Sequence, residues 1–124
     1  MSEPAPNPIP LILWSAFGMT HLVLVFITTL IPPQPSNPGM VLFVIPALAS
    51  ATISVGARSI FKGNFPAQTL FIVRWALAES ATLMGFVSWY ISGDRPVQAV
   101  CTLAGLAAWA IAMPRDVSAW GRPS

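Results

Sequence analysis

Charged residues are scarce in this chain of 124 residues. Lys, Arg, Asp and Glu together make up 8% of it, whereas soluble domains carry about 25%. So few charges cannot solvate the surface of a small globule, whose surface is large relative to its volume. The formal net charge of +2 is also too small to form a nucleic-acid-binding surface. The composition therefore argues against a soluble enzyme, a nucleic-acid binder or a disordered tail, and it predicts an integral membrane protein.

Cysteine and histidine are equally rare, with Cys101 and His21 as the sole examples. One cysteine forms no internal disulfide, and the side chains that ligate metals show no metal-site spacing. The sequence also lacks a phosphate-binding loop, a nucleophile elbow and a catalytic triad. We therefore expect a protein that is not an enzyme and that binds no metal or other cofactor.

Long apolar stretches are what the chain does contain, because 55% of its residues are hydrophobic. A membrane-spanning helix needs about 20 residues, with about 17–25 the usual range, whereas a membrane strand alternates apolar and polar residues. We predict an all-α polytopic membrane protein, a single domain over residues 1–124 with four transmembrane helices in an up-down bundle. Pro46 lies inside the second predicted helix and should kink it. The predicted helices span residues 11–31, 39–57, 67–91 and 97–113.

The Lys and Arg residues between these helices predict the orientation. Arg58, Lys62, Arg115 and Arg122 fall on one side and Arg95 on the other, and cytoplasmic loops carry the excess of positive charge. We expect both termini in the cytoplasm and the protein in a bacterial plasma (inner) membrane. Aromatic and basic side chains gather at the membrane surface, and the predicted interface residues are Trp14, Trp89, Tyr90, Trp120, Arg58 and Lys62.

Glu79 is the most informative residue, because it lies about 18 Å along the third predicted helix. This depth is near the bilayer midplane, where a carboxyl costs on the order of 3 kcal/mol. Ionisable residues at such depths commonly mark ion or proton pathways. The alternative is a carboxyl that only ties helices together by hydrogen bonding.

Arg74 and His21 are the other ion- or proton-binding candidates. Arg74 lies about 10 Å along the third helix, where its side chain can extend to the membrane surface or pair with a carboxylate. An Arg74–Glu79 bridge within the helix is poorly aimed, since the two positions are about 140° apart around it. His21 lies about 15 Å along the first helix, so it either packs among helices or hydrogen-bonds to Glu79.

Small residues recur every three or four positions in the second and fourth predicted helices. Such stripes let helix backbones approach closely in membranes, either within the chain or between copies of it. The predicted packing residues are Ala47, Ser50, Ala51, Ser54, Cys101, Gly105 and Ala108.

The central hairpin, about residues 45–90, resembles the proteolipid subunit c of F-type ATP synthases. The resemblance rests on Arg58 at the turn and on the sequence ALAESATLMGFV at residues 76–87, in which Glu79 follows Arg58 by 21 residues. It implies that Glu79 corresponds to the ion-carrying carboxylate of that family. The chain departs from the family by lacking its dense glycine repeat and by having a further helix on each side of the hairpin.

Two functional hypotheses follow. In the first, the chain is a small accessory or structural subunit in the lipid bilayer that acts through helix–helix contacts in a larger membrane complex or homo-oligomer. In the second, it handles protons or ions with Glu79, tuned by His21 or Arg74. Neither hypothesis involves nucleic acid.

Overall fold

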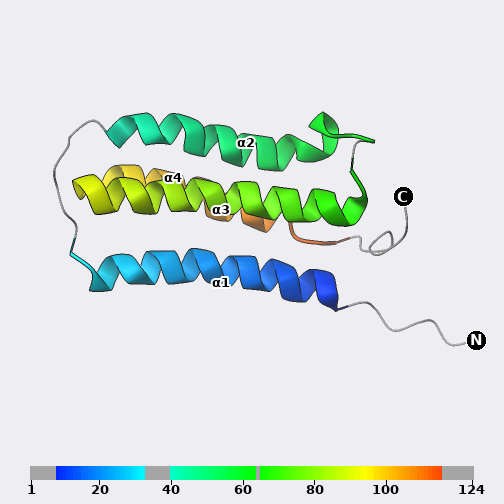
Figure 1. Cartoon of the computed structure of the whole chain (residues 1–124), viewed down its shortest axis with the longest axis horizontal. Helices are drawn as coiled ribbons and strands as arrows, with labels where there is room; N and C mark the ends of the chain where they lie inside the picture. Colours follow the sequence, from blue (N-terminus) through cyan, green and yellow to red (C-terminus); the bar gives the residue numbers. More distant parts are fainter. Residues whose placement is uncertain (1–7, 33–39, 64, 116–124) are drawn as a thin grey trace, which may run out of the picture.

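The computed structural model describes residues 8–32, 40–63 and 65–115, and four α-helices account for most of them (Figure 1). No strand occurs within these ranges, so the all-α prediction is confirmed for the part of the chain that is described. The helices are α1 (Ile9–Leu30), α2 (Val44–Ile60), α3 (Ala67–Ser92) and α4 (Arg95–Ile111), and a 3-10 helix, η1 (Met40–Phe43), leads into α2.

The helix ends follow from local chemistry. Gly93 ends α3 with a left-handed φ of 72°, a conformation that glycine adopts without steric cost. Asp94 then caps α4, because its Oδ1 accepts a hydrogen bond from the Val97 amide at 3.1 Å. The turn from α3 to α4 is therefore short, and the two helices pack closely along their length.

The structure removes the reason for the predicted kink at Pro46. Helix α2 begins at Val44, later than predicted, so Pro46 lies in its first turn. Backbone N–H groups in a first turn have no partner within the helix, and proline removes no hydrogen bond there. The 3-10 helix η1 takes the place of the expected first turn.

Successive helices run in opposite directions, as Figure 1 shows. Helix α3 is central: α4 lies behind it in this view, and α2 and α1 lie on either side. Helix α1 contacts α3 and α4, and it makes no contact with α2. One end of the bundle therefore contains the start of α1, the end of α2, the start of α3 and the end of α4.

Two of the four helices, α1 and α3, are long and apolar enough to cross a membrane. Buried core helices and signal sequences have the same length and composition. Helices α2 and α4 are apolar but have 17 residues each. The coarse prediction of a helical bundle with apolar, membrane-length helices is confirmed, and four membrane spans stay a prediction.

Apart from Trp75 and Trp89, which are fully buried, the interior of the bundle is built mainly from small and polar side chains. Among the described residues, no Leu, Ile, Met or Phe is fully buried, and the buried apolar residues are mainly alanines. Large apolar side chains lie outside instead: Phe26 is 62% exposed, Leu103 66% and Ile45 68%. This arrangement is the reverse of a soluble core, where Ile, Leu, Phe and Met are the residues buried most often.

Candidate functional site

Glu79 lies at the middle of α3, beside the buried face of that helix. Its neighbours Ala78 and Thr82 are fully buried, whereas Glu79 is partly exposed. Its carboxyl makes no hydrogen bond or ion pair with any residue in the described ranges. The carboxyl is therefore available to a group outside the bundle.

Of the two interpretations of His21, the structure shows packing among helices, with no hydrogen bond to Glu79. His21 is fully buried, and its Nδ1 shares a hydrogen bond of 2.6 Å with Thr82 Oγ1 on α3. Its Nε2 is buried with no hydrogen-bond partner in the described part of the chain. In the neutral ring one nitrogen donates and the other accepts, so either tautomer leaves Nε2 unsatisfied. His21 is thus a helix–helix contact with one unused polar atom.

His21 is the middle of three contacts that hold α1. Trp14, His21 and Thr28 follow one another at seven-residue spacing, which places them on one face of the helix. The indole rings of Trp14 and Trp109 stack with centroids 4.2 Å apart. Each indole N–H donates to the other residue's carbonyl, at 2.9 Å and 2.8 Å. We call this arrangement the tryptophan pair.

Thr28 makes the third contact of α1, with Arg95 at the start of α4. Arg95 donates to Thr28 Oγ1 and to the Thr28 carbonyl, both at 3.2 Å, and to Gln98 Oε1 at 3.0 Å. Its guanidinium also lies 4.7 Å from the centroid of the Trp89 ring, within cation–π range. A cation is favoured beside the last carbonyls of a helix, so Arg95 stabilises the end of α1.

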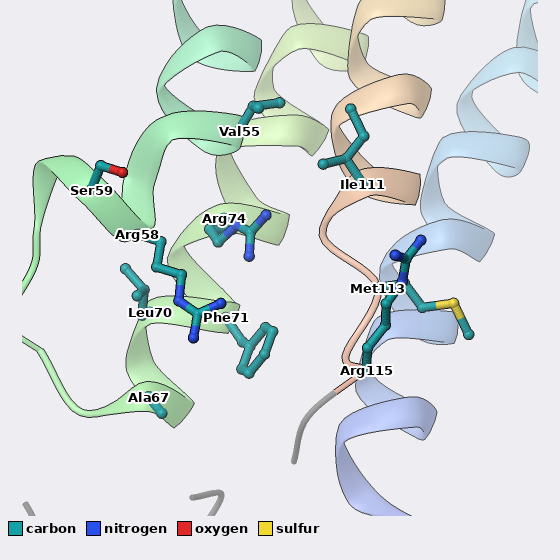
Figure 2. Close-up of a pocket in the computed structure, with 10 residues that line it drawn as sticks. All are labelled: Val55, Arg58, Ser59, Ala67, Leu70, Phe71, Arg74, Ile111, Met113 and Arg115. Atoms are coloured by element: carbon teal, nitrogen blue, oxygen red, sulfur yellow. The ribbon is translucent and has the colours of Figure 1, made fainter. Parts of the chain in front are cut away.

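The opposite end of the bundle has a cavity of about 450 Å³, formed by α2, α3, the end of α4 and the residues that follow it (Figure 2). Three arginines line it: Arg58 at the end of α2, Arg74 in α3 and Arg115 after α4. In Figure 2 the side chains of Arg58 and Arg74 come from one wall and that of Arg115 from the other. We call it the arginine cavity.

Arg74 is fixed by a reciprocal pair of hydrogen bonds between α2 and α3. Ser54 Oγ donates to the Arg74 carbonyl at 2.6 Å, and Arg74 Nε donates to the Ser54 carbonyl at 3.1 Å. The two terminal nitrogens of the guanidinium have no partner among the described residues. Arg74 therefore directs its charge into the arginine cavity, and it forms no ion pair with Glu79.

The predicted packing residues lie between helices, apart from Ser50, which is only partly buried. Gly105 marks a close approach of α4 to α3: a Cβ at this position would overlap Thr82 Oγ1 and come within 2.7 Å of the Ala78 carbonyl oxygen. A Cβ at Gly85 would come within 2.7 Å of Cys101 Cβ. The buried members of the predicted set are Ala47, Ala51, Ser54, Cys101, Gly105 and Ala108.

The predicted interface residues have different surroundings. Trp89 is 1% exposed and lies against Arg95, so an exposed anchor at the membrane surface does not fit it. Trp14 is partly buried in the tryptophan pair. Tyr90, Arg58 and Lys62 are exposed, and Trp120 lies outside the described residues.

Sequence reasoning missed Trp109, Arg95 and Arg115 as site residues. The positions of Arg58 and Arg115 at the same predicted side of the membrane were the available signal for the arginine cavity. The partners of Trp109 and Arg95 depend on which face of α4 is turned toward α1. Counting charged residues in the loops gives no information on that orientation. Within the described ranges, no group of three or more His, Cys, Asp or Glu residues is placed to hold a metal ion.

Comparisons of the chain with protein-family models, curated proteins and solved structures found no match. The resemblance of residues 45–90 to subunit c stays a prediction.

Proposed function

We propose that this chain is a multi-pass membrane protein whose four helices all cross the bilayer. Support comes from its interior of small and polar residues and its exterior of large apolar ones. Lipid tails are as apolar as leucine, so membrane helices gain nothing by burying leucine and pack through small residues instead. The 17 residues of α2 and of α4 meet the lower limit of about 17 for a span.

The charge bias favours a cytoplasmic position for the arginine cavity and both termini, in a bacterial inner membrane. Ser59 lies in the last turn of α2 and lines the cavity, and Ile31 follows α1 at the other end. In a Cys101→Ala background, a cysteine at position 59 should react with a membrane-impermeant thiol reagent only after the cells are opened. A cysteine at position 31 should react in intact spheroplasts. The reverse pattern would invert the proposed orientation.

We further propose that the protein is a non-enzymatic accessory or structural subunit that acts through helix–helix contacts. The observation that carries this proposal is the carboxyl of Glu79, which has no partner among the described residues. An unpaired carboxyl in a membrane costs on the order of 3 kcal/mol. A hydrogen-bond donor on another helix, from a larger complex or a second copy, removes that cost.

The native mass in mild detergent tests this function. We expect a mass above that of the single chain, lost in Glu79→Leu and retained in Glu79→Gln, because the amide still hydrogen-bonds. Ser80→Leu is the matched control: among the described residues, the Ser80 hydroxyl bonds only to the Ala76 carbonyl of its own helix, at 2.9 Å. A monomeric wild type, or equal loss in Ser80→Leu and Glu79→Leu, would contradict the proposal.

The same unpaired carboxyl favours a second candidate function, proton or ion handling by Glu79. A carboxyl that carries an ion has to change its protonation or its partner during transport, and a permanent internal ion pair would oppose that change. His21, with its unused Nε2, and Arg74 are the groups that would tune it.

Liposome flux separates the two candidates. Ion handling predicts that Glu79→Gln abolishes proton flux while the native mass is unchanged, and that dicyclohexylcarbodiimide modifies wild-type Glu79. Normal flux in Glu79→Gln, together with no carbodiimide labelling of the wild type, leaves the subunit function alone.

A further inference from the structure

The arginine cavity contains more positive charge than the described protein neutralises. None of the ten residues that line it is acidic. Arg58 and Arg115 are exposed and make no hydrogen bond or ion pair with any described residue. The positive charge of Arg58 also acts repulsively on Arg74. Three like charges around one cavity repel one another, and a bound anion removes that repulsion.

Arg95, at the opposite end of the bundle, is an arginine whose donors are used within the protein, and it serves as a comparison for the arginines of the cavity. Its guanidinium donates to three oxygens and lies over an indole ring. Within the described part of the chain, the arginines of the cavity lack such partners, apart from the single bond from Arg74 Nε to the Ser54 carbonyl. That bond holds the Arg74 guanidinium in place and leaves its two terminal nitrogens for a ligand.

We propose that the arginine cavity binds an anionic phosphate group, and that its source is the headgroup of an acidic phospholipid. Arginine presents N–H donors in a fork that matches phosphate oxygens. Basic pockets between membrane helices on the cytoplasmic side bind acidic lipid headgroups. The volume of about 450 Å³ is within the range of small-ligand sites, about 300–1,000 Å³.

The apolar part of the lining favours a lipid over a free anion. Leu70, Phe71 and Ile111 line the same cavity as the arginines, and Figure 2 shows the Phe71 ring between its two walls. A free phosphate has no apolar part to contact these side chains, whereas a phospholipid has acyl chains next to its phosphate. The choice of lipid rests on the proposed membrane location, and the choice of phosphate does not.

The test uses the whole chain, purified in mild detergent and stripped of lipid. Native mass spectrometry reports binding of added phosphatidylglycerol or phosphatidylcholine, and a thermal melt reports the effect of inorganic phosphate. We expect phosphatidylglycerol to bind at least tenfold more tightly than phosphatidylcholine, whose choline the arginines repel. Stabilisation by inorganic phosphate alone would support the phosphate site and assign it to a soluble ligand.

Substitutions of the three arginines test whether the lipid binds in the arginine cavity. Arg58→Gln combined with Arg115→Gln should weaken phosphatidylglycerol binding at least tenfold. Arg74→Lys should weaken it less, since the charge stays and the fork is lost. Lys62→Gln is the matched control, because Lys62 is an exposed cation near the same end that does not line the cavity.

Equal binding by the Arg58/Arg115 double variant and by Lys62→Gln would overturn the proposal, as would equal binding of the two lipids without any effect of phosphate. Neither result depends on Glu79 or on the native mass of the lipid-free protein. Failure of the phosphate site is thus distinguishable from failure of the proposed subunit function.

Discussion

Helix α1 and the three helices beside it are held by different kinds of contact. Helices α2, α3 and α4 approach one another mainly through alanine, glycine and serine, as at Gly105, where a single added methyl group has no room; the Ser54–Arg74 hydrogen bonds add a polar contact between α2 and α3. Helix α1 keeps its large apolar residues outside, has one close contact at Gly18 against Trp109, and makes its hydrogen bonds to its neighbours through Trp14, His21 and Thr28. In close packing, many small contacts along a helix each contribute a little to stability. In hydrogen bonding, a few residues contribute most of it. Single substitutions should therefore affect the two regions in different ways.

The tryptophan pair should be the most sensitive point of α1. Trp109→Ala removes the stacked ring and its hydrogen bonds, and it leaves a cavity beside Gly18. We expect a loss of about 3–5 kcal/mol in the free energy of unfolding, measured by titration from mild detergent into dodecyl sulfate. Phe26→Ala, at an exposed position on α1, is the control and should change little. Similar losses in the two variants would show that α1 has no point contacts.

Gly105→Ala should have the next largest effect, because it forces α3 and α4 apart. Overpacking of this kind costs about 1–3 kcal/mol. Gly56→Ala is the matched control: its added Cβ would meet only Ile60 Cδ1, at 3.5 Å. Alanine is the better helix former by about 1 kcal/mol, so Gly56→Ala should stabilise the protein. If both substitutions changed the stability in the same direction, Gly105 would not be a close helix–helix contact.

The bond between Thr28 and Arg95 is expected to contribute less. Thr28→Val removes the hydroxyl and leaves the carbonyl that Arg95 also contacts, so we expect a loss of about 1 kcal/mol. A double-mutant cycle with Arg95→Gln should give a coupling energy above about 0.5 kcal/mol. Additive effects would mean that the two side chains do not interact in solution.

Glu79→Gln should have the smallest effect on the unfolding of the isolated chain. The carboxyl makes no contact with the described residues that an amide would lose, so we expect a change within about 0.5 kcal/mol. A larger loss would reveal an internal partner, and it would weaken both functions that rely on Glu79 facing outward.

The sequence predicted helix number, direction and most of the small-residue contacts, because these depend on the length of apolar stretches and on residue volume. It placed His21 and Glu79 at a similar depth but left open whether they bond to each other, since depth along a helix does not specify rotation about its axis. Trp89 shows the same limit: its position near a helix end suggested a surface anchor, and rotation of α3 buries it. The arginine cavity is lined by three segments that are far apart in the sequence. Their charge placed Arg58 and Arg115 on one side of the membrane, but only the folded structure shows that they line one cavity with Arg74.

The partners of α1 all come much later in the chain. Thr82 follows His21 by 61 residues, Arg95 follows Thr28 by 67, and Trp109 follows Trp14 by 95. During synthesis into a membrane, α1 therefore leaves the ribosome long before any helix that can bind it. In the proposed membrane location, α1 would first stand in lipid with His21 unpaired, and its length and apolar sequence are compatible with that state. Assembly of the bundle then ends with α1 docking onto a finished α3–α4 pair, so truncation before Trp109 should release α1 first.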